Sequence, residues 1–103
     1  MKTLLIGFNG NEFAKEDVRS FVEWNWDVDD TRALTDGLKI KAITTKSGNV
    51  KGFKVYYIGS SACIYEVDGM TNKAYKVHRG KRTEEFQILS VHAMKLFDYW
   101  MAH

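Results

Sequence analysis

Four consecutive segments with strand character, between residues 38 and 78, constrain the fold of this chain more than any other feature. Residues 38–42 alternate apolar and polar side chains with a period of two, as a strand with one solvated face does. Residues 53–58, 62–67 and 73–78 are rich in β-branched and aromatic residues. Short turn signals that contain Gly, Asn, Ser or Asp separate the segments. The pattern predicts an antiparallel meander of four strands.

The segment before this meander predicts one strand and one helix. Residues 3–8 form a short apolar run, which is typical of a buried strand, and Asn and Gly residues follow it. Apolar residues then recur at helical spacing, which indicates one buried helix face made by Ala14, Val18, Phe21 and Val22. The predicted helix ends near residues 25–27.

The segment after the meander predicts a long amphipathic helix. Thr83 is a candidate N-cap, and the acidic Glu84 and Glu85 that follow it suit a first helical turn. On a helical wheel one arc holds the apolar residues Phe86, Leu89, Ala93, Leu96, Phe97 and Trp100.

The predicted order of elements is therefore β-α-β-β-β-β-α. The apolar face of a four-stranded meander needs a cover, and the two helices can provide it. We expect a single α+β domain over residues 1–103, with both helices packed on one face of the antiparallel sheet. The lone cysteine, Cys63, rules out an intramolecular disulfide and fits a reducing compartment. No long apolar segment is present, so we expect a cytoplasmic protein that is not bound to a membrane.

The charges of the chain are unevenly distributed. The net charge is only +2, yet residues 38–82 hold ten Lys and Arg residues against two Asp and Glu residues. The flanking segments 1–37 and 83–103 are both net acidic. Such asymmetry bears on the partners of a protein and not on its fold.

Strand alternation predicts that many of these basic residues share one surface. We expect the sheet face away from the helices, together with the residues just past its last strand, to carry Lys39, Lys41, Lys54, Tyr56, Lys76, His78, Arg79, Lys81 and Arg82. Lysines with an aromatic residue among them are typical of phosphate contact combined with base stacking. The same pattern also fits a solvated sheet face whose lysines protect strand edges from aggregation.

The acidic stretch from Asp27 to Asp30 offers a second candidate surface. Its spacing does not match a calcium-binding EF-hand loop, because Thr31 and Arg32 stand where a ligand and a glycine are needed. Two carboxylates could hold Mg²⁺, or could attract a basic partner. An ordinary acidic loop beside Trp24 and Trp26 fits equally well, and we predict no metal or cofactor.

The last predicted helix carries a second apolar stripe. The residues on this stripe, or next to it, are Ile88, Val91, His92, Lys95 and Tyr99. An exposed apolar stripe with an aromatic residue can mark a contact with a partner or with a second copy, while a flanking loop or strand would also cover it.

These patterns lead to a function hypothesis with two alternatives. Neither an acid/base pair, nor a nucleophile with its base, nor a cofactor loop is recognisable, so we expect no enzyme. The first hypothesis is a small binding protein that docks on a larger protein or protein–nucleic-acid complex, such as a mobile-element or phage-type inhibitor of a nucleic-acid-handling complex. The second is a domain that binds nucleic acid directly through the basic sheet face, and the third is a small enzyme. The sequence identifies neither the partner nor the oligomeric state, and a homodimer fits it as well.

Overall fold

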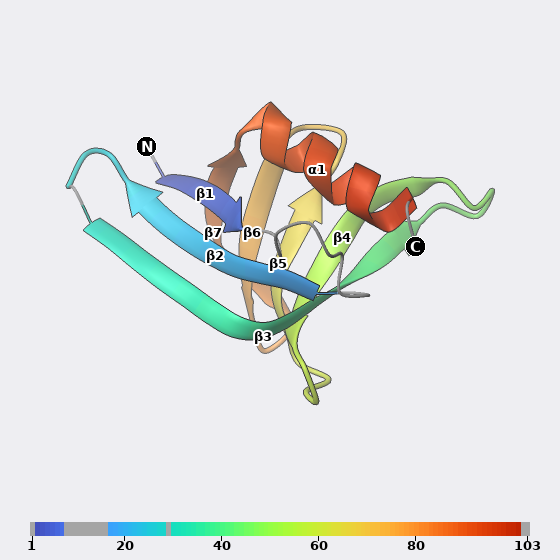
Figure 1. Cartoon of the computed structure of the whole chain (residues 1–103), viewed down its shortest axis with the longest axis horizontal. Coiled ribbons are helices and arrows are strands. Elements are labelled where there is room, and N and C mark those ends of the chain that lie inside the picture. Colours follow the sequence, from blue (N-terminus) through green and yellow to red (C-terminus); the bar gives the residue numbers. More distant parts are fainter. Residues whose placement is uncertain (1, 8–16, 29, 102–103) are drawn as a thin grey trace.

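Seven strands that close into a barrel and one helix make up the described part of the molecule (Figure 1). The structure, a computed structural model, describes residues 2–7, 17–28 and 30–101, with the side chains at 17, 19, 35, 36 and 98–101 outside that description. The elements are β1 (Lys2–Gly7), β2 (Asp17–Asn25), β3 (Asp30–Thr44), β4 (Val50–Tyr57), β5 (Cys63–Asp68), β6 (Lys73–His78), β7 (Lys81–Ile88) and α1 (Ser90–Met101).

Each strand of the barrel pairs with the next strand along the chain in antiparallel fashion. A short parallel pairing of β1 with β7, at Thr3 with Gln87 and Leu4 with Ile88, closes the ring. The four strands predicted between residues 38 and 78 are all present, and they pair in the expected order. Closure removes most free edges, so the sheet needs no pair of helices to cover it.

The predicted α+β fold with two helices is wrong, because the described chain is mostly strand and contains one helix. Residues 17–25 form β2, where the sequence pattern predicted a helix. A register shift between Val18 and Ser20 explains the error. Because of this irregularity, Val18 and Phe21 are both buried although they lie three residues apart, which imitates helical spacing. Ala14, the first residue of the predicted helix face, lies outside the described residues.

The C-terminal helix begins seven residues later than predicted, at Ser90 and not at Thr83. Residues 81–88 form β7, in which the buried Phe86 and Ile88 flank the exposed Gln87. This period of two is the signature of a strand. The predicted cap is therefore wrong, since the Thr83 hydroxyl bonds the Lys76 carbonyl on the neighbouring strand.

The interior of the barrel is apolar, and α1 lies across one of its ends (Figure 1). Ala93 and Leu96 of α1 are buried in the same core as the strand residues, while Phe97 packs edge-on against Phe53 at 5.1 Å between ring centroids. Trp100 was predicted to join this stripe, but its side chain lies outside the described part. The helix therefore closes one end of the barrel and leaves the other end to the strands.

Two hairpins extend toward opposite ends of the longest axis of the molecule (Figure 1). One is formed by β2 and the first half of β3, and the other by the second half of β3 and β4. Gly37 separates these halves and has a φ of 67°, a left-handed conformation that glycine adopts without steric cost. Strand β3 can therefore serve two hairpins with different partners.

Candidate functional site

The outer face of the β3–β4 pair carries a group of basic residues around one tyrosine. Lys39 lies opposite Tyr56 in the register, and Lys41 lies opposite Lys54. The Lys41 ammonium sits over the Tyr56 ring, 5.3 Å from its centroid, which is a cation–π distance. The inward-facing residues of the same strands, such as Ile40 and Val55, are fully buried. We call the outward group of Lys39, Lys41, Lys54 and Tyr56 the basic ribbon.

The basic ribbon lies in a part of the chain that contains no acidic residue. Five lysines and no Asp or Glu occur between Gly37 and Tyr65. Two acidic residues lie opposite ribbon lysines in the register: Asp17 on β2 opposite Lys39, and Glu66 on β5 opposite Lys54, where Glu66 pairs with Arg82 at 2.9 Å. Lys41 and Lys54 form no ion pair with a side chain that the structure describes, so their charges are available to a partner.

The structure assembles only part of the predicted basic surface. Arg82 is engaged with Glu66, and its guanidinium also stacks on Tyr75 at 4.1 Å from the ring centroid. Arg79 and Gly80 form the two-residue turn between β6 and β7, both with positive φ. His78 and Lys81 flank this turn and are exposed. These residues lie at the ends of their strands and not on the ribbon.

The prediction for Lys76 is wrong, because this side chain faces the inside of the barrel. Lys76 lies opposite the buried Tyr65 on β5, and its ammonium is 3.2 Å from the Glu23 carboxylate. Strands β2 and β6 are not neighbours in the sheet, so this ion pair crosses the open end of the barrel. A register shift between Lys76 and Val77 breaks the simple alternation from which the outward direction was predicted.

A cluster of polar residues fills the barrel end opposite α1. The Tyr65 hydroxyl donates a hydrogen bond to the Glu23 carboxylate, which also holds Lys76. Burial, followed by this hydrogen bond and the negative charge of Glu23, raises the pKa of Tyr65 well above its usual range. Tyr65 therefore stays a neutral hydrogen-bond donor, and the opposite charges of Glu23 and Lys76 pair with each other within the cluster.

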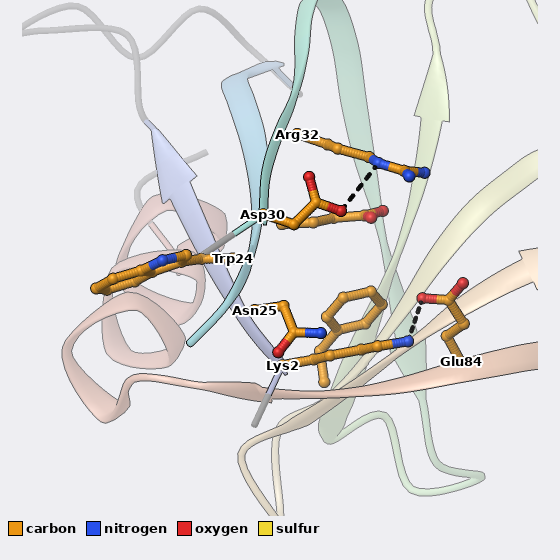
Figure 2. Close-up of a pocket in the computed structure, with 8 residues that line it drawn as sticks. Lys2, Trp24, Asn25, Asp30, Arg32 and Glu84 are labelled. Atoms are coloured by element: carbon orange, nitrogen blue, oxygen red, sulfur yellow. Dashed lines mark hydrogen bonds and ion pairs between the residues drawn. The ribbon is translucent and has the colours of Figure 1, made fainter. Parts of the chain in front are cut away.

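A small pocket of about 170 Å³ opens beside this cluster (Figure 2). Figure 2 shows two ion pairs on its walls: Lys2 with Glu84 at 3.0 Å, and Arg32 with Asp30 at 3.5 Å. The Trp24 side chain points away from both pairs. Because each of these charges has a partner on the protein, the pocket offers little unpaired charge to a small ligand.

In the acidic stretch from Asp27 to Asp30, Asp27 lies in the turn that follows β2, and Asp30 is the first residue of β3. Asp30 pairs with Arg32, and Trp26 is exposed and packs against Trp24 with ring centroids 5.3 Å apart. Asp29 lies outside the described residues. Within the described ranges, no three His, Cys, Asp or Glu side chains are placed to hold a metal ion together.

The predicted apolar stripe on the last helix is only partly present. Ile88 belongs to β7 and is buried, so the prediction that it is exposed is wrong. Val91 and Lys95 are exposed on α1, while the side chain of Tyr99 lies outside the described part. His92 is half-buried, and its Nδ1 accepts a hydrogen bond from the Ile6 backbone N–H at 3.2 Å. This bond joins the helix to the first strand.

We expect His92 to make folding stability depend on pH. Burial, and then the charge of Lys95, lower its pKa below the usual 6.5, so the folded protein favours the neutral imidazole. Its contribution is present above pH 6.5 and is lost as the pH falls toward the lower pKa of the folded state. Urea denaturation at several pH values between 5 and 8 measures this loss. His92→Asn keeps a hydrogen-bond acceptor that does not titrate. If this variant loses as much folding stability as the unaltered protein when the pH falls, the effect belongs to other groups.

The side chains of Cys63 and Ser60 each form a hydrogen bond with the backbone. The pKa of the Cys63 thiol is raised, chiefly by burial, and the thiol donates to the Tyr65 carbonyl. The Ser60 hydroxyl accepts a hydrogen bond from the Ala62 N–H within the β4–β5 loop. A raised pKa makes a thiol a poorer nucleophile.

Comparison with known proteins identifies no family for this chain. The chain matches no protein-family model, no curated protein and no solved structure. In the part of the chain that is described, no helix has the length and apolar character that crossing a membrane requires.

Proposed function

We propose that this protein is a binding protein whose basic ribbon contacts the phosphate groups of nucleic acid. The observation that carries the proposal is the direct opposition of Lys41 and Lys54 on one exposed sheet face, with no described carboxylate paired to either. Like charges opposite each other on neighbouring strands destabilise a sheet. A polyanion bound to this face would relieve that repulsion.

The chemistry of the ribbon fits single-stranded nucleic acid in particular. Lysines that neutralise phosphates release counterions, which gives binding a sequence-independent driving force. Tyr56 lies among these lysines and is partly accessible, so a base can stack against it. Docking on an acidic surface of a larger protein, including a nucleic-acid-handling complex, would use the same lysines but would gain nothing from stacking.

We expect the double variant Lys41→Glu with Lys54→Glu to bind a fluorescent single-stranded DNA oligonucleotide at least about tenfold more weakly. The slope of log K against log salt should fall by about 1.4, or 0.7 for each lost phosphate contact on a single strand. Fluorescence anisotropy at several salt concentrations measures both quantities. Circular dichroism first confirms that the variant is folded.

A matched control is the double variant Arg79→Glu with Lys81→Glu, which changes the net charge equally at the β6–β7 turn. Equal weakening by both double variants would show a diffuse charge effect and would contradict a site on the ribbon. Tyr56→Ala separates the two kinds of partner. It should weaken binding to DNA while leaving binding to polyglutamate unchanged, since only a base can stack on the ring.

A further inference from the structure

We infer that a pocket at one end of the basic ribbon binds a single guanine base of the nucleic acid held there. Ile43 and Gly52 are the next outward pair of the β3–β4 register after the ribbon residues, since their neighbours Ala42 and Phe53 pack in the core. A cavity of about 240 Å³ opens at this pair. The inference rests on the proposed function, because the ribbon would hold the phosphates of the molecule whose base enters the pocket.

Glycine at position 52 leaves the floor of this pocket open. A Cβ there would collide with the Val67 carbonyl on β5, so the close approach of the two strands requires glycine. The missing side chain leaves room between Ile43 on β3 and Asp68, which lies opposite Gly52 on β5. The exposed Met70 forms another part of the wall. Ile43 and the adaptable Met70 can contact the faces of a planar base.

Hydrogen bonds fix the β5–β6 turn that carries Asp68 and Met70. The Gly69 N–H donates to the Lys51 carbonyl at 3.0 Å, which ties the turn to the beginning of β4. The Asp68 carboxylate accepts a hydrogen bond from the Met70 N–H at 2.8 Å. The position of this carboxylate is therefore set before a ligand binds, which reduces the entropic cost of binding.

Asp68 provides the carboxylate that a ligand in this pocket can reach. Glu66 also lines the pocket, but Arg82 binds it at 2.9 Å. Asp68 forms no ion pair with a side chain that the structure describes, and a carboxylate can accept further hydrogen bonds besides the one from Met70. Lys51 lines the pocket as well and is exposed. A carboxylate beside lysines suits a nucleotide, which combines an anionic phosphate with N–H donors on its base.

Guanine is the base whose hydrogen-bonding edge fits a carboxylate. Its Watson–Crick edge presents two adjacent donors, the ring N–H and the amino group, and the two oxygens of a carboxylate can accept from both at once. Adenine and cytosine place a ring-nitrogen acceptor beside their amino group, and thymine places its N–H between two carbonyl oxygens. A carboxylate repels each of these acceptors. Proteins that recognise single-stranded segments commonly read this edge.

The test compares two fluorescent DNA oligonucleotides of eight nucleotides, oligothymidine and the same molecule with one central guanine. The unaltered protein should bind the guanine-containing oligonucleotide about tenfold more tightly. Hypoxanthine in place of guanine lacks the amino group and should reduce this preference. The analogue 7-deazaguanine keeps the Watson–Crick edge and should retain the preference. Fluorescence anisotropy measures all four affinities.

Asp68→Asn tests the residue that we assign to recognition. The amide keeps the size of the side chain and an oxygen that can accept the Met70 N–H, so the turn should stay folded, but it no longer offers two acceptor oxygens. This variant should bind the two oligonucleotides with equal affinity. Asp30→Asn removes the same charge at the β2–β3 hairpin and should leave the preference intact. A preference that survives in Asp68→Asn, or that both variants lose equally, would overturn the assignment to this pocket.

The unaltered protein also distinguishes a failure of the pocket from a failure of the ribbon. Binding of both oligonucleotides with equal affinity would overturn the guanine pocket and leave the basic ribbon as the site of contact. Binding of neither oligonucleotide would overturn the proposed function, and this inference with it.

Discussion

Replacing Phe53 by alanine is expected to lower the free energy of unfolding by about 3–5 kcal/mol, the usual cost of removing a fully buried aromatic side chain. Phe53 is completely buried in the barrel and also contacts Phe97 of α1 edge-on. The substitution would leave a cavity where the strands meet the helix that closes this end of the barrel. Urea denaturation followed by circular dichroism measures the change.

Tyr56 supplies a matched control, because it lies on the same strand and faces the other side of the sheet. Tyr56→Ala removes a ring of similar size that is only partly buried and contacts Lys41. It should cost less than about 1 kcal/mol, the range of an exposed cation–π contact. Similar losses for Phe53→Ala and Tyr56→Ala would contradict the assignment of the two faces of β4.

Glu23→Ala is expected to destabilise the fold by about 2–3 kcal/mol, although the side chain it removes is charged. The substitution leaves the Tyr65 hydroxyl without its acceptor and removes the carboxylate that pairs with Lys76 at 3.2 Å. Hydrogen bonds to a charged group contribute about 1.5–3 kcal/mol, and a buried donor left unpaired adds its desolvation cost. We place the value below that of a fully buried ion pair because the Lys76 side chain is 41% exposed.

Tyr65→Phe and the double variant complete the test of this polar cluster. Tyr65→Phe removes only the hydroxyl, so it should cost about 1–2 kcal/mol while Glu23 keeps Lys76. If the hydroxyl and the carboxylate interact as described, the double variant should lose less than the sum of the two single losses. Strictly additive losses would contradict a direct hydrogen bond between them.

The sequence predicted the direction of side chains correctly in the strand segments where one periodicity holds from end to end. In β4 and the second half of β3 the charged residues alternate with buried ones, such as Lys54 between Phe53 and Val55. The composition of this region also indicated a basic surface. Three lysines and the tyrosine of the predicted site, at 39, 41, 54 and 56, do share one face.

Tertiary structure decided the remaining elements, because local pattern and final pairing disagree there. In β2 the register shift beside Val18 buries two residues at helical spacing, and only pairing with β1 and β3 makes the segment a strand. In β6 a register shift follows Lys76, and this lysine faces the barrel interior together with Ala74, toward Glu23. Barrel closure also depends on contact between the two ends of the chain, β1 and β7. Local sequence alone thus indicated the strands between residues 38 and 78 and the basic character of this region. Long-range pairing decided that the sheet closes, that its far end is polar and that β3 pairs with β4 only from Leu38 onward, because hydrogen-bond register depends on neighbours distant in sequence.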